Sequence, residues 1–196
     1  EKKNPYVREL MAYLEGIMEF KIIHTFHGIL FYDDKHPDDI ARDRLITSIH
    51  GSMGDLVNII GEVEYVYQTI QPSDDLYHKE AVEGIQKFFE ENPEYEAVGF
   101  AQGYICNYLT KEVAEYNPKT NPPFYTIKFP RNIFIDPLKH AEYTSIKQDM
   151  GKYKAGTPCP SHEYIGGALK YGVANERGFL VGCHSENIST YYNHPF

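Results

Sequence analysis

The chain lacks tryptophan, has only three cysteines and carries fewer positive than negative charges. Its 19 Lys and Arg against 28 Asp and Glu give a formal net charge of −9, and such a chain repels the phosphate backbone of nucleic acids. We therefore expect no nucleic-acid partner. No hydrophobic run approaches the roughly 18 residues that suggest a membrane span, so we also expect no transmembrane segment.

Motifs of several common enzyme classes are also absent. The sequence contains no Gly-x-Gly-x-x-Gly, phosphate-binding loop, Gly-x-Ser-x-Gly or His-Glu-x-x-His, which argues against nucleotide cofactors and the commonest serine and zinc hydrolases. The hydrophobic fraction of 42% and charged fraction of 24% are typical of a globular domain. Because the chain does not begin with Met and Asn187-Ile188-Ser189 fits the glycosylation pattern, we expect a processed, exported protein, periplasmic or extracellular.

Residues 5–116 predict a mostly α fold, an antiparallel four-helix bundle. Asn4-Pro5 is a strong helix start, because Asn can cap the first amides and Pro there loses no hydrogen bond. Asn92-Pro93 repeats this signal before the fourth predicted helix. The short third helix has an apolar face of Ala81, Ile85, Phe88 and Phe89. The second predicted helix has a heptad-like seam, formed by Leu45, Ile49, Ser52, Leu56, Ile59, Val63, Tyr67 and Ile70.

Residues 117–196 predict a small mixed α/β region that forms one compact unit with the bundle (residues 1–116). We expect strands over residues 124–129 and 133–135 and a short helix over residues 138–150. A hairpin is expected from strands 163–171 and 178–183, with residues 172–177 as the turn. Residues 20–31 are apolar on all sides, which predicts that the C-terminal region covers this part of the first helix.

Histidines in this apolar stretch suggest a ligand pocket. His24 and His27 lie three residues apart, on one helical face, among aromatic and aliphatic residues that would suit haem or another flat hydrophobic ligand. His162 and Tyr104 would add polar contacts from outside the first helix. We therefore predict a domain that binds a small molecule or a metal or haem cofactor between residues 20–31 and the C-terminal region.

A second cluster has the residue types of a transition-metal site. Cys159, His162, Cys183 and His184 form the pattern C-x2-H-x20-C-H, and thiolate and imidazole are good ligands of zinc and iron. Adjacent Cys183 and His184 would point to opposite faces of a strand and would not readily bind one metal ion together. A disulfide between Cys159 and Cys183 is therefore an alternative.

Two further functional classes remain open. Cys106 on a predicted helix followed by His162 before a strand is the order of a Cys/His hydrolase, and the four candidate ligands could instead serve a metal-dependent enzyme. The other class is a helical module that binds a protein partner.

Overall fold

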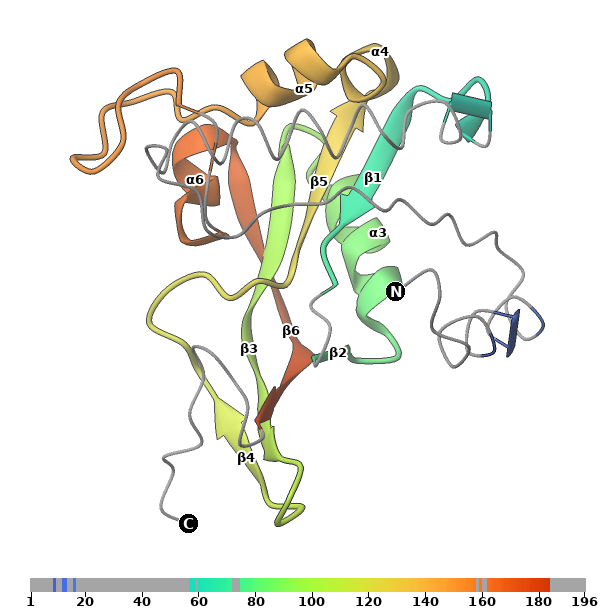
Figure 1. The fold of residues 1–196 in the computed structure, drawn as a ribbon, viewed down its shortest axis with the longest axis vertical. Coiled ribbons are helices and arrows are strands. Elements are labelled where there is room, and N and C mark those ends of the chain that lie inside the picture. Colours follow the sequence, from blue (N-terminus) through green and yellow to red (C-terminus); the bar gives the residue numbers. More distant parts are fainter. Residues whose placement is uncertain are drawn as a thin grey trace.

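The computed structural model describes residues 60–71, 75–157, 159 and 162–183, together with residues 9, 12, 13, 16, 57 and 58. In these ranges a strongly curled six-stranded sheet carries several short helices (Figure 1). The elements, in chain order, are β1 (Tyr65–Thr69), β2 (Leu76–Tyr77), α3 (Ala81–Glu91), β3 (Ala97–Asn107), β4 (Val113–Tyr116), β5 (Tyr125–Pro130), α4 (Arg131–Phe134), α5 (Pro137–Tyr143), the 3₁₀ helix η1 (His162–Tyr164), α6 (Ile165–Ala168) and β6 (Tyr171–Cys183).

The two longest strands, β3 and β6, form the centre of the sheet. The strand order is β1-β5-β3-β6-β2, and β4 also pairs with β3. The β3–β6 pair is parallel and every other pair is antiparallel. β5 pairs with the first residues of β3, and β4 pairs with the later residues of β3. Both strands therefore lie along the edge of β3 that is not paired with β6.

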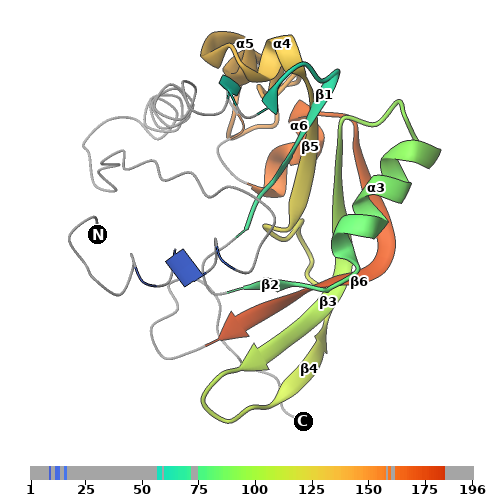
Figure 2. The same ribbon diagram turned by 90° about the vertical axis from the view of Figure 1, so that its right-hand side faces the viewer.

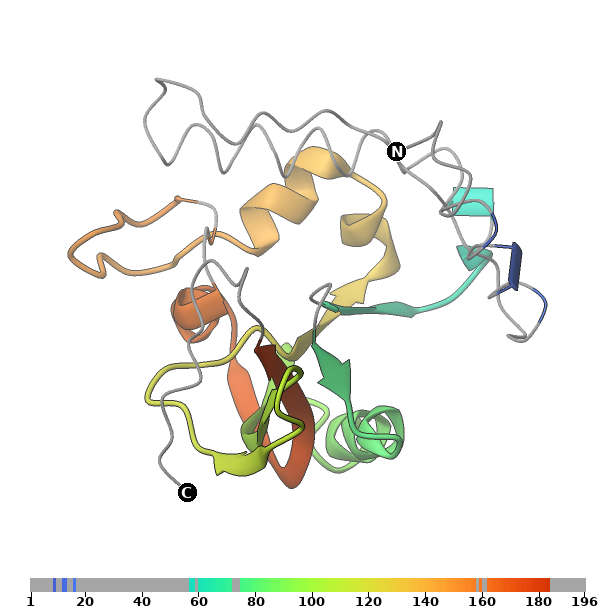
Figure 3. The same cartoon turned by 60° about the horizontal axis from the view of Figure 1, so that its bottom comes forward.

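An irregular register between β3 and β6 curls the sheet. Phe100 lies opposite Ala174 and Gln102 opposite Arg177, so one intervening residue in β3 faces two in β6. The next pair is Gly103 and Phe179, which leaves a further extra residue in β6. Extra residues of this kind bend a strand and increase its twist. Figure 3 shows the resulting curvature.

The sheet separates two hydrophobic clusters on its opposite faces. Successive side chains of a strand point to opposite faces, and Ala97 and Val98 of β3 accordingly belong to different clusters. The first cluster includes Ile85 and Phe89 of α3, and the second includes Ile165 of α6. Figure 2 shows α3 and α6 on opposite sides of the β3–β6 pair.

Glycines let aromatic rings lie directly on the β3–β6 backbone. A Cβ atom on Gly178 would stand 2.2 Å from Phe100 Cδ1, and one on Gly103 would stand 2.5 Å from the carbonyl oxygen of Phe179. Phe179 in turn stacks on Phe124, with ring centroids 4.4 Å apart. Any larger residue at these two glycines would therefore have to displace the central packing of the first cluster.

The predicted four-helix bundle over residues 5–116 is wrong. The expected fourth helix is β3 and β4, and the end of the expected second helix is β1. The spacing of Ala97, Ala101, Tyr104 and Tyr108 fits one face of a helix. In the structure, however, β3 is a central strand with neighbours on both edges, and its first four residues are all buried. Such a strand lacks the simple alternation of a half-exposed one.

Other predicted elements have mixed outcomes. The short third helix is confirmed as α3, strand 124–129 as β5, and part of helix 138–150 as α5. Residues 133–135 do not form a strand, because α4 extends through Phe134. The expected C-terminal hairpin is wrong, since residues 162–168 are helical and β6 runs unbroken through the expected turn.

Much of the first two predicted helices lies outside the described residues, although the described Glu9, Ala12, Tyr13 and Gly16 are helical. The sheet joins strands from both sides of residue 116. In the part of the chain that the structure describes, each helix is too short or too polar to cross a lipid bilayer.

Candidate ligand-binding pocket

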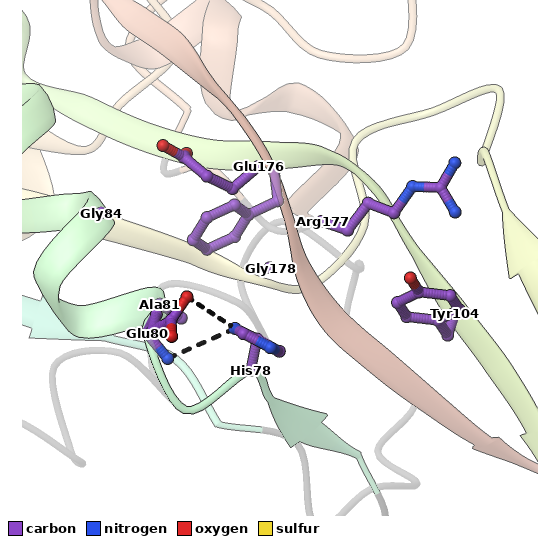
Figure 4. A pocket seen from close by; sticks show the side chains of 9 residues that line it. His78, Glu80, Ala81, Gly84, Tyr104, Glu176, Arg177 and Gly178 are labelled. Atoms are coloured by element: carbon purple, nitrogen blue, oxygen red, sulfur yellow. Dashed lines mark hydrogen bonds and ion pairs between the residues drawn. The ribbon is translucent and has the colours of Figure 1, made fainter.

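A pocket of about 330 Å³ lies where the β2–α3 connection and the start of α3 meet the irregular part of β6 (Figure 4). Charged, aromatic and small residues share its lining. They are His78, Glu80, Ala81, Gly84, Phe100, Tyr104, Glu176, Arg177 and Gly178. Phe100 is almost fully buried and provides an apolar wall, whereas Glu80 and Glu176 are exposed.

Backbone hydrogen bonds fix the β2–α3 connection at the pocket. The His78 amide donates to the carbonyl oxygen of Gly178 at 2.8 Å, and the Ala81 amide donates to the carbonyl oxygen of His78 at 2.9 Å. The Glu80 amide donates to His78 Nδ1 at 3.3 Å. The Glu80 carboxylate is 4.0 Å from the same nitrogen, too far for a hydrogen bond.

Gly84 and Glu176 face each other across one side of the pocket. A Cβ atom on Gly84 would lie 3.6 Å from Glu176 Oε2, an ordinary van der Waals contact. The Glu176 carboxylate makes no hydrogen bond or ion pair with any residue in the described ranges. The carboxylate next to Gly84 thus has no counter-charge within the described ranges.

The guanidinium of Arg177 is occupied by other groups. It forms an ion pair with Glu115 of β4 and lies over the ring of Tyr104, 5.4 Å from the ring centroid. The hydrogen bond from Arg177 lowers the pKa of the Glu115 carboxyl, and the same hydrogen bond raises the pKa of Arg177. Figure 4 shows Glu176 and Arg177 directed to opposite sides of β6. The side of the pocket next to α3 is therefore acidic.

Of the four residues predicted to bind a cofactor, the structure places Tyr104 in this pocket, on a strand instead of a helix. His162 lies in η1, and its Nδ1 donates to the backbone carbonyl oxygen of Asn121. His24 and His27 lie outside the described residues, as do residues 20–31, so the pocket predicted there stays a prediction.

The structure does not support the predicted metal site. Cys183 is buried in the first hydrophobic cluster, whereas Cys159 packs against the second cluster on the other face. His184 lies outside the described residues. Within the described ranges, no three His, Cys, Asp or Glu side chains come together as metal ligands. Neither cysteine forms a disulfide in the described structure, so the alternative of a Cys159–Cys183 disulfide is wrong.

The geometry also gives no support to a Cys/His hydrolase. Cys106 is a free thiol buried on β3, and no hydrogen bond joins it to His162 in the described structure.

The sequence analysis missed most of the pocket. Glu176 and Arg177 were assigned to the turn of a hairpin, and His78 and Glu80 attracted no functional interpretation. One available signal was Gly84, a glycine in the middle of an otherwise regular helical pattern. The other residues become neighbours only through the pairing of β6 with β2 and β3, which no local pattern specifies.

Comparison with known proteins identifies no relative: no family model, curated protein or solved structure matches the chain.

Proposed function

We propose that this domain binds a small organic molecule in the pocket between α3 and β6. The observation that carries the proposal is the pocket itself, whose lining combines Phe100 and the small residues Ala81 and Gly84 with several polar groups. Ligand sites characteristically combine an apolar lining with a few polar groups and enclose about 300–1,000 Å³. The pocket's volume of about 330 Å³ suits a ligand at the small end of that range.

Packing and backbone geometry do not require a glycine at position 84. Its φ is not in the left-handed region, and a Cβ atom would meet only Glu176, at 3.6 Å. Glycine inside a helix costs about 1 kcal/mol relative to alanine. Gly84 therefore weakens α3 while leaving room in the pocket, which is the opposite of the tight contacts that demand glycine at Gly103 and Gly178.

Binding can be tested by NMR titration of the full ¹⁵N-labelled chain with a mixture of small polar and aromatic compounds. The proposal predicts concentration-dependent shifts of the amide signals of Ala81, Gly84 and Gly178, which line the pocket. Shifts confined to other parts of the sheet, or none at concentrations of about 10 mM, would refute it, because even weak ligands with a Kd near 1 mM would then be detected.

A pair of leucine variants separates pocket filling from a general effect on α3. Gly84→Leu places a large side chain in the pocket and is expected to abolish the shifts. Gln86→Leu introduces the same side chain at an exposed position of the same helix and is expected to preserve them. Equal binding by the two variants would show that the ligand binds elsewhere.

A further inference from the structure

We infer that the ligand of this pocket is a small organic cation, an ammonium compound with an apolar or aromatic portion. This inference rests on the proposed function and adds the charge class of the ligand. The juxtaposition that carries it is Glu176, a glutamate without an ion-pair partner among the described residues, in contact range of Gly84 in the lining of the pocket.

The charges that line the pocket do not balance. Glu80 and Glu176 are both exposed carboxylates, whereas the charge of Arg177 is compensated by Glu115. Glu80 has a counter-charge in Lys79, with a nitrogen–oxygen distance of 3.8 Å. Glu176 has no such partner among the residues described. A cationic ligand in the pocket next to Glu176 would supply the missing counter-charge, because opposite charges attract.

The groups that could attract an anion lie next to carboxylates or accept a hydrogen bond themselves. The imidazole Nδ1 of His78 accepts a hydrogen bond from the Glu80 amide at 3.3 Å. The positive end of the α3 dipole faces the carboxylates of Glu80, at the N-cap position, and Glu83, in the first turn. A negatively charged ligand would therefore meet two like charges, Glu80 and Glu176, without a free cationic partner in the lining.

The aromatic wall supports the same ligand class. Phe100 lines the pocket and is 1% exposed, so its ring is held in place by the surrounding core. An apolar portion of the ligand would gain from contact with the apolar lining. Ala81 and Gly84 add small residues to the α3 side of that lining.

Three probes of similar shape test the charge class: 2-phenylethylammonium, the neutral 2-phenylethanol and the anionic 3-phenylpropionate. Each is titrated into the full chain while the amide signals of Gly84 and Gly178 are followed. We expect the cation to bind at least about threefold more tightly than the alcohol, and the anion to bind weakest. Equal or tighter binding of the alcohol or the anion would overturn the inference.

Two glutamine variants locate the charge effect. Glu176→Gln is expected to weaken binding of the cation about two- to fivefold and to leave the affinity of the alcohol unchanged, because it removes charge while keeping size. Glu90→Gln makes the same change at an exposed position near the other end of α3 and is expected to leave both affinities unchanged. Equal loss in both variants, or none in Glu176→Gln, would refute the role of Glu176.

The outcomes distinguish the two proposals. If compounds of the mixture described above shift the pocket signals but the ammonium probe does not, the charge class is wrong and small-molecule binding stands. If neither the mixture nor any probe shifts these signals, both proposals fail.

Discussion

The buried histidine of α5 makes the stability of this domain depend on pH. His140 is 2% exposed and its ring stacks on Phe129, with centroids 4.2 Å apart and an interplanar angle of 19°. Its Nε2 is 3.4 Å from Oε1 of Gln68, and its Nδ1 has no hydrogen-bond partner in the described structure. Burial lowers the pKa of His140 from 6.5 to about 4. The folded protein therefore holds this imidazole in its neutral form.

The sign of the effect follows from which state binds the proton more readily. Between pH 6.5 and about 4 the unfolded chain protonates this histidine while the folded chain does not. The contribution of neutral His140 to the free energy of unfolding is thus present above pH 6.5 and is lost as the pH falls towards 4. A pKa difference of this size lowers the free energy of unfolding by about 2 kcal/mol between pH 7 and pH 5, and by about 3 kcal/mol once the pH is below 4.

Urea denaturation at pH 5, 6 and 7, followed by circular dichroism, measures this dependence. Other titrating groups contribute in every sample, so the quantity of interest is the difference between the wild-type protein and variants without a titrating group at this position. His140→Phe keeps an aromatic ring against Phe129, and His140→Gln keeps a polar side chain of similar length. Both variants should lose about 2 kcal/mol less than the wild type between pH 7 and pH 5. Parallel losses in all three proteins would refute the reasoning.

Three further predictions follow from the glycines and cysteines. Gly84→Ala should raise the free energy of unfolding by about 0.5–1 kcal/mol in urea, and a decrease would show that the fold requires this glycine. Gly178→Ala should lower it by about 2 kcal/mol, because the new Cβ atom would stand 2.2 Å from Phe100 Cδ1; unchanged stability would contradict that close approach. A thiol reagent without reductant should modify half-buried Cys159 in the native protein and all three cysteines after unfolding, whereas a total below three would reveal a disulfide.

The elements that the sequence could predict are those in which the apolar side chains follow one clear local period. Ile85 and Phe89 of α3 are buried and lie four residues apart, so they mark one side of a helix clearly. In β5, Ile127 and Phe129 are buried around the half-buried Lys128, and this apolar period of two marks a strand, although Thr126 on the other face is buried as well. In both cases local spacing directly reflects the surface that packs on the core.

The central strands could not be predicted because their exposure pattern depends on partners far away in sequence. β3 is buried over residues 97–100, then exposed at Ala101 and Gln102, where the register with β6 shifts. Glu176-Arg177-Gly178 resembles a turn in sequence because small and charged residues adjoin there, yet in the structure it is an irregular segment within one long strand. The pocket built on this segment was therefore missed together with the strand.

The curl of the sheet and the pocket have a common structural origin at Gly178. This residue falls between Arg177 and Phe179, which pair with adjacent residues of β3, so it has no partner of its own in that strand. Its carbonyl oxygen instead accepts the His78 amide at 2.8 Å, which fixes the connection that carries His78 and Glu80. Its missing side chain makes room for the ring of Phe100, the wall of the pocket. Because one position bends β6, anchors the β2–α3 connection and admits the aromatic wall, a change that straightens β6 would also dismantle the pocket.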